Sequence, residues 1–113
     1  MGPVVVKPIP VDLGLLIRQA SAYRYEAVVE RLTKDSIPRF FGLLQPGSSV
    51  SYSEVLLAVL CTPGVRRARI VRLSRATKPG GVPPEKLEFA ADELPTLGQV
   101  EIDFDPEATQ TPF

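Results

Sequence analysis

Two stretches of the chain alternate between hydrophobic and polar residues. Residues 11–17 place a hydrophobic side chain at every odd position, and in residues 100–104 acidic side chains separate Val100, Ile102 and Phe104. Alternation with a period of two is typical of a β-strand with one face buried. Each stretch therefore predicts a half-buried strand.

Between these strands, hydrophobic residues recur three times with the helical spacing i, i+3, i+4, i+7. The three sets are Tyr25, Val28, Val29 and Leu32; Ile37, Phe40, Phe41 and Leu44; and Tyr52, Val55, Leu56 and Val59. Residues with this spacing lie on one side of an α-helix. The pattern predicts helices that each pack one hydrophobic side against the sheet.

The first two helical sets are out of phase with each other. They begin at Tyr25 and Ile37, twelve residues apart, whereas three helical turns take about 11 residues. Pro38 lies at this point, and proline inside a helix clashes with the carbonyl four residues earlier. The sequence therefore predicts two helical segments with a kink or break near residues 35–38, where Ser36 could be the N-cap of the second helix.

The third helix has recognisable ends. Ser51 and Glu54 have the spacing of a capping box, in which each side chain accepts a backbone N–H of the first turn. The same pattern explains Ser51 and Glu54 without a catalytic role. The helix is predicted to stop at Pro63 and Gly64.

After this helix, residues 65–73 predict an arginine-rich strand. Two adjacent hydrophobic residues, Ile70 and Val71, interrupt its alternation, which predicts a β-bulge. Residues 74–97 form a long connection rich in proline and glycine, with a short strand predicted at 87–89.

Together these elements predict an α+β fold, with the order strand, helix, helix, helix, strand, long connection, strand. The expected architecture is a small, mostly antiparallel sheet with two to three helices packed on one face. Residues 11–105 form the predicted domain. Residues 1–10 contain three prolines and predict an extended lead-in or linker, and residues 106–113 predict a frayed tail.

Composition narrows the chemistry. The 113 residues include thirteen basic and thirteen acidic side chains, which excludes a strongly basic or acidic tail and argues against disorder of the whole chain. With no histidine and one cysteine, an internal disulfide, a Cys/His zinc site and imidazole catalysis are excluded. We expect no enzyme activity, metal or cofactor, and a buried Cys61. No membrane span or signal peptide is recognised.

The balanced charge hides an uneven distribution. Six basic residues stand close together without an acidic residue between them: Arg66, Arg67, Arg69, Arg72, Arg75 and Lys78. From Glu85 onward there are eight acidic residues and one basic residue. The basic cluster is either an interface for an acidic partner or nucleic acid, or it is neutralised within the chain.

For neutralisation within the chain, Arg67 and Arg69 would lie opposite Glu101 and Asp103 on adjacent antiparallel strands. RNA binding is disfavoured, because RNA-binding sheets stack bases on exposed aromatic residues, and Phe104 is the only aromatic residue on a clearly predicted strand.

Several segments carry a resemblance to a known family. They are KPIPVDLGLLI at 7–17, GSSVSYSEVLLAVLCTPGV at 47–65 followed by RRARIVRL, and DELPTLGQVEI at 92–102. In order and spacing they resemble the C-terminal domain of baseplate J-like proteins, which are wedge components of contractile phage tails and related contractile injection machines. The resemblance covers roughly residues 4–104, and family members are usually longer.

The resemblance implies a structural, non-enzymatic domain that mediates contacts between subunits of a baseplate wedge or ring. Its partners would be other baseplate subunits or copies of itself, and it would have no small-molecule substrate, cofactor or membrane. It would be located in a virion tail, or in the bacterial cytoplasm within an assembled injection particle. The alternative is a stand-alone nucleic-acid-binding or regulatory α+β module that uses the arginine-rich strand 65–73.

Overall fold

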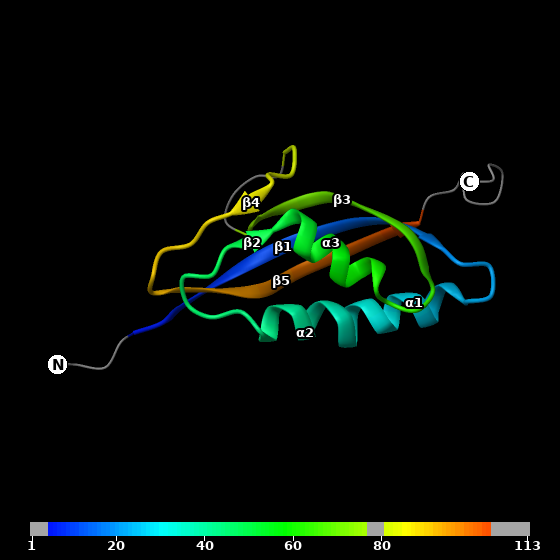
Figure 1. Ribbon diagram of the computed structural model, residues 1–113, viewed down its shortest axis with the longest axis horizontal. Coiled ribbons are helices and arrows are strands. Elements are labelled where there is room, and N and C mark those ends of the chain that lie inside the picture. The colour runs from blue at the N-terminus through cyan, green and yellow to red at the C-terminus, as the bar shows by residue number, and fades with distance from the viewer. Residues whose placement is uncertain (1–4, 77–80, 105–113) are drawn as a thin grey trace.

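A three-stranded sheet forms the centre of the protein in the computed structural model, which describes residues 5–76 and 81–104. Strand β1 (Lys7–Gln19) lies between β3 (Val65–Arg75) and β5 (Glu93–Phe104), antiparallel to β3 and parallel to β5 (Figure 1). Two short strands, β2 (Val50–Ser51) and β4 (Lys86–Leu87), form a separate antiparallel pair. The predicted α+β class is confirmed, and the main sheet is mixed.

Strand β1 begins at Lys7, inside the segment expected to be a lead-in. Residues 7–10 have a strand partner only in β5, because β3 ends at Arg75, opposite Val11. Just beyond β3, the N–H of Ala76 donates to the carbonyl of Pro10 at 2.9 Å. Pro8 and Pro10 cannot donate a backbone hydrogen bond, and proline is tolerated in a strand where one side has no neighbouring strand. The chain can therefore continue β1 through both prolines.

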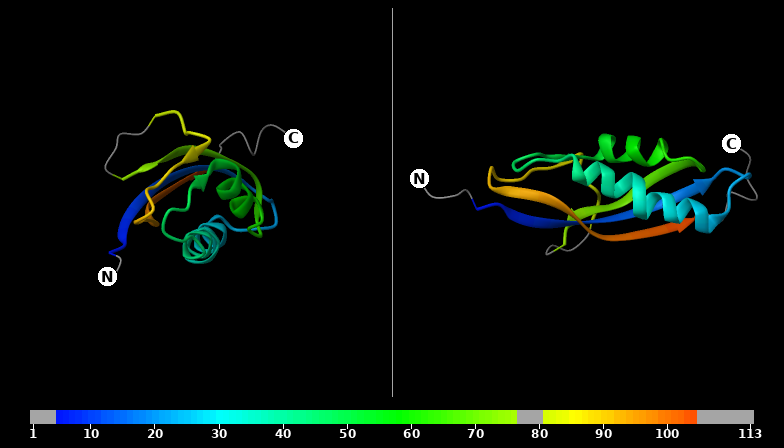
Figure 2. Two further views of the ribbon diagram at one scale, coloured as in Figure 1. Left: turned by 60° about the vertical axis from the view of Figure 1, so that its left-hand side comes forward. Right: turned by 90° about the horizontal axis from the view of Figure 1, so that it is seen from below.

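The helices lie together on one face of the main sheet (Figures 1 and 2). The first helical rod consists of α1 (Tyr25–Arg31), a π-helical turn η1 (Leu32–Ser36) and α2 (Ile37–Gly42), and the second is α3 (Tyr52–Leu60). The α2 segment contacts β5, and α3 contacts β3. The two rods thus cover the sheet from one edge to the other, as expected for helices packed on one face.

The π-helical turn absorbs the phase slip between the first two hydrophobic sets. In η1 the N–H of Ile37 donates to the carbonyl of Leu32, five residues earlier, and this longer loop takes up an extra residue. The twelve-residue spacing therefore keeps both sets on the same side of the rod. Leu32, the first residue of the turn, and Ile37, which follows it, are both buried.

The predicted boundary between two helical segments near residues 35–38 is confirmed, since η1 ends at Ser36 and α2 begins at Ile37. The predicted N-cap role of Ser36 is wrong. Ser36 has helical backbone angles (φ −61°, ψ −51°) and makes no capping bond. Its hydroxyl accepts a hydrogen bond from Thr62 Oγ1 at 2.6 Å. In a regular α-helix, Pro38 would clash with the carbonyl four residues earlier. The π-type turn before it has hydrogen bonds to carbonyls five residues earlier, and this change in spacing lets the rod continue through the proline.

The core lies between the helices and one face of the sheet. The odd-numbered residues 11–17 of β1 pack in one cluster with the buried sides of the helices and with β3. The buried hydrophobic residues of the core are Val11, Leu13, Leu15, Ile17, Val28, Leu32, Ile37, Phe41, Val50, Val55, Val59, Ile70 and Leu73. The alternation in β1 and the three helical sets therefore identified most of this core.

The start of α3 differs from the predicted capping box. Ser51 occupies the N-cap position, but its hydroxyl lies 3.0 Å from that of Ser53 and bonds no helix N–H. Instead, the N–H of Tyr52 donates to the carbonyl of Glu85 at 2.8 Å. Because β2 pairs with β4 directly before the helix, the segment that leads into β4 supplies this acceptor.

The predicted bulge in the arginine-rich strand is confirmed. Gly14 and Leu15 of β1 lie opposite Arg72 and Ile70 of β3, so Val71 is the extra residue. The bulge lets both Ile70 and Leu73 reach the core, where each is 2% exposed.

Candidate functional site

The side of the main sheet opposite the helices carries most of its charged residues, and we call it the helix-free face. It contains the even-numbered residues of β1 and the residues paired with them on both neighbouring strands. From Asp12 onward along β1, its members are Asp12, Gly14, Leu16, Arg18, Arg67, Arg69, Arg72, Ser74, Glu101 and Asp103. The described part of this face contains no aromatic residue, so it does not resemble a base-stacking platform.

Three of the six predicted basic site residues share the helix-free face. Arg67, Arg69 and Arg72 project from β3, opposite Arg18, Leu16 and Gly14 of β1. Arg69 is exposed, whereas Arg72 is partly buried beside a carboxylate of β1. The arginines therefore form a row along one edge of the sheet.

The other three predicted residues do not join this row. Arg66 is the extra residue at a second irregularity, between the pairs formed by Arg67 and Val65. Arg75 lies opposite Val11 and is thus on the helix-covered side. Lys78 falls outside the described residues.

The predicted cross-strand pairing within the chain is wrong. Strand β1 separates β3 from β5, so Leu16 lies between Arg69 and Asp103, and Gly14 lies between Arg72 and Glu101. Neighbouring strands are about 4.8 Å apart, and the two charged rows are therefore two strand spacings apart. Arginines line one edge of the helix-free face, and carboxylates line the other.

Arg75 is held in a network at the end of β3. Its guanidinium binds both carboxylate oxygens of Glu93, at 3.1 and 3.2 Å, and donates to the carbonyl of Glu88 at 2.8 Å. It also lies over the Phe89 ring, 4.5 Å from its centroid. Arg75 thus fixes the segment before β5 to the end of β3.

The same contacts act on Glu93. The hydrogen bond from Arg75, followed by that from the N–H of Ala90, lowers the pKa of the Glu93 carboxyl. Both donors stabilise the charged carboxylate relative to its protonated form.

The lowered pKa of Glu93 predicts a pH-dependent stability. A depressed carboxyl pKa stabilises the fold above the ordinary glutamate value of about 4.3, and this contribution is lost as the pH falls through the lower folded-state pKa. We expect Glu93→Gln to reduce the free energy of unfolding at pH 7, and the difference from the wild type to shrink below about pH 4. Denaturant titrations at several pH values measure this. Glu88→Gln, a change at an exposed side chain, is the control. An equal difference at pH 7 and pH 3 would contradict the assignment.

Asp12 is a buried carboxylate that links all three strands, and the sequence analysis did not identify it. It is 7% exposed. Its Oδ1 accepts the N–H of Gln99 at 2.9 Å, and its Oδ2 lies 3.3 Å from Arg72 Nη2. The bonded N–H belongs to an irregularity where Gly98 and Gln99 together oppose Asp12. A Cβ on Gly98 would lie 2.5 Å from Asp12 Oδ1 and 2.9 Å from the backbone carbonyl oxygen of Val11, so a larger residue there would require the backbone to shift.

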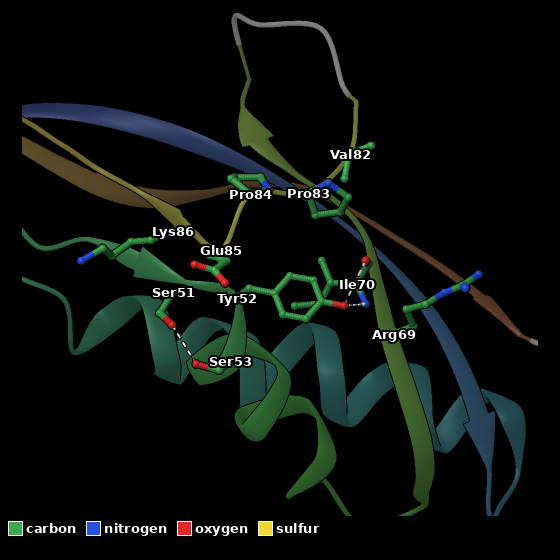
Figure 3. Close-up of a pocket in the computed structure, with 10 residues that line it drawn as sticks. All are labelled: Ser51, Tyr52, Ser53, Arg69, Ile70, Val82, Pro83, Pro84, Glu85 and Lys86. Carbon is green, nitrogen blue, oxygen red and sulfur yellow. Dashed lines mark hydrogen bonds between the residues drawn. The ribbon is translucent and has the colours of Figure 1, made fainter.

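A groove with a volume of about 800 Å³ lies beside the outer edge of β3 (Figure 3). The side chain of Tyr52 lines this groove and reaches β3. Its hydroxyl accepts a hydrogen bond from the Ile70 N–H at 3.3 Å and donates one to the Ile70 carbonyl at 3.4 Å. Pro83 and Pro84 line the groove together with Arg69. Tyr52 therefore occupies backbone groups of β3 that would otherwise be open to another strand.

The polar side chains of the groove do not form a recognisable catalytic arrangement. The Ser51 and Ser53 hydroxyls bond each other, and no histidine is present to activate them. Among residues 5–76 and 81–104, no three histidine, cysteine, aspartate or glutamate side chains gather as metal ligands. Cys61 is exposed, so its predicted burial is wrong: it follows the last turn of α3 on the side away from the core.

In the same described ranges, no helix is both long and hydrophobic enough to cross a membrane. No known protein-family profile matches the chain, and no curated protein is significantly similar to it.

Proposed function

We propose that this chain is a structural domain of a contractile-tail baseplate wedge and that it mediates assembly between protein subunits. The observation that carries the proposal is the helix-free face, where an arginine row and a carboxylate row occupy opposite edges of one sheet. Such edges suit protein neighbours with complementary charge. The domain would act without catalysis or a cofactor.

The segments that resemble the baseplate J-like family give further support. Residues 7–17 lie in β1, residues 47–65 run through β2 and α3 to the start of β3, and residues 92–102 lie largely in β5. These elements are the main sheet and one of its covering helices, so the resemblance involves segments that pack together. The partners would be other baseplate subunits or further copies of this chain, in a virion tail or an assembled injection particle.

Nucleic-acid binding is the second candidate, since Arg67, Arg69 and Arg72 share one row. Phosphate recognition by such a row needs no aromatic residue. However, Arg72 already contacts Asp12, and Glu101 and Asp103 lie on the same face and would repel a phosphate backbone. The balance of charge on this face favours a protein partner.

Charge reversal separates the two candidates. We expect Arg66→Glu/Arg69→Glu to weaken co-assembly with baseplate subunits, measured by co-sedimentation, and to make the remaining assembly more sensitive to salt. A titration with duplex DNA and RNA is run in parallel. Micromolar nucleic-acid binding in physiological salt, with a steep salt dependence that the substitutions flatten, would replace the proposed function with the second candidate.

A further inference from the structure

We propose that copies of this chain associate head to tail, with the β3 edge of one copy pairing with the β5 edge of the next. The arginines of one copy then face the carboxylates of its neighbour across the shared helix-free face. This inference rests on the proposed assembly function and names a second copy of the chain as a partner.

Both outer edges of the main sheet are free of a strand neighbour in the described part of the chain. On β3, the Ile70 N–H and carbonyl point outward to Tyr52. Alternate residues of an antiparallel strand direct their backbone groups to the same side, so those of Ala68 also point outward. Tyr52 thus marks the end of the free stretch, which lies between Ile70 and the start of β3.

On β5, one backbone contact likewise marks the end of the free edge. The Glu93 carbonyl accepts the N–H of Gly47 at 2.8 Å. Further along, β5 pairs on one side with β1 as far as Phe104. The free part of this edge therefore lies in the half of β5 that carries Glu101 and Asp103.

The geometry of the two edges is complementary. Since β3 is antiparallel to β1 and β5 is parallel to it, placing copies side by side in the same orientation sets β3 antiparallel to the neighbour's β5. Arg67 and Arg69 are two residues apart, as are Glu101 and Asp103. One register then places Arg67 opposite Asp103 and Arg69 opposite Glu101, which are stabilising cross-strand pairs.

Charge also selects against the alternative pairings. Two β3 edges would bring arginines together, and two β5 edges would bring carboxylates together, and like charges directly opposite each other destabilise a sheet. A two-fold dimer through identical edges is therefore disfavoured. Head-to-tail contact leaves one free edge at each end, so it continues into a ring if it closes and a filament if it does not.

Charge swapping tests this arrangement on the full chain. Arg67→Glu/Arg69→Glu makes both edges acidic, and Glu101→Lys/Asp103→Lys makes both edges basic. We expect each variant alone to lose self-association by at least about tenfold in sedimentation velocity. An equimolar mixture should associate again, because each acidic edge then meets a basic edge. The quadruple variant, with both edges swapped, should also associate. Circular dichroism verifies that each variant is folded, and Glu88→Gln is the surface control.

The outcomes separate this inference from the proposed function. Recovery of association in the mixture supports the β3–β5 contact. If the wild-type chain stays monomeric at high concentration and low salt, or if the mixture does not recover, the head-to-tail contact is overturned. Co-assembly of the monomeric chain with baseplate subunits would leave the proposed function standing while this inference fails.

Discussion

Leu15→Ala should destabilise the protein by about 2–5 kcal/mol, the usual cost of removing a fully buried leucine side chain from a packed core. Leu15 is 0% exposed and belongs to the core cluster that the central strand shares with the helices. Its neighbours on the helix-covered side include Ile70 and Ile102, which are its register partners on β3 and β5. The resulting cavity would be bordered by the middle of the sheet, where collapse is difficult. Chemical denaturation followed by circular dichroism measures the loss.

The adjacent residue provides a matched control. Leu16 points to the helix-free face and is only partly buried, so Leu16→Ala should cost no more than about half as much, in proportion to the smaller area removed from water. Equal losses for the two variants would mean that both faces of the sheet are packed. That result would contradict a helix-free face available to a partner.

Asp12→Ala should cost about 1–3 kcal/mol, the penalty for leaving a buried polar group without its partner. The substitution removes the acceptor of the Gln99 N–H and the carboxylate beside Arg72. Thermal or denaturant unfolding measures the change.

Asp103→Ala tests whether the effect belongs to the buried site rather than to the charge of this face. Asp103 is exposed, and an isolated surface substitution usually changes stability by less than about 0.5 kcal/mol. Similar losses at both positions would refute the role of Asp12 as a link between strands.

The period of the hydrophobic pattern predicted the helices and strands well, because each of them buries one side and the spacing of its own hydrophobic residues identifies that side. The alternation at 11–17 and the three helical sets predicted β1, the helices and much of the core, and the adjacent apolar pair Ile70–Val71 predicted the bulge. These features depend on which side of a strand or helix is buried. The residues of that one strand or helix are enough to determine it.

The order of the strands could not be read in this way. Alternation in residues 65–73 and 100–104 shows that each strand has a polar face, but it does not show which strand lies beside which. Placing β1 between β3 and β5 separated the charges that were expected to pair. The alternation at 11–17 is the same for a central strand as for an edge strand, so it gave no sign of this arrangement.

Local irregularities were located better than they were interpreted. The spacing from Tyr25 to Ile37 pointed to residues 35–38, but a break and a π-helical turn both correct a one-residue slip. Asp12 and Gly98 gave no comparable local signal, because their contact joins positions far apart in the chain. Gly98 also lay outside the predicted strand 100–104, and only the longer β5 of the structure places it within a strand.

The most direct test of the assembly role is the protein composition of purified contractile particles from the source organism. Quantitative mass spectrometry of particles isolated by density gradient should find this chain at a fixed whole-number ratio to the other baseplate subunits, with the ratio maintained through repeated purification. A chain that is abundant in the cells but absent from the purified particles would contradict the proposed function.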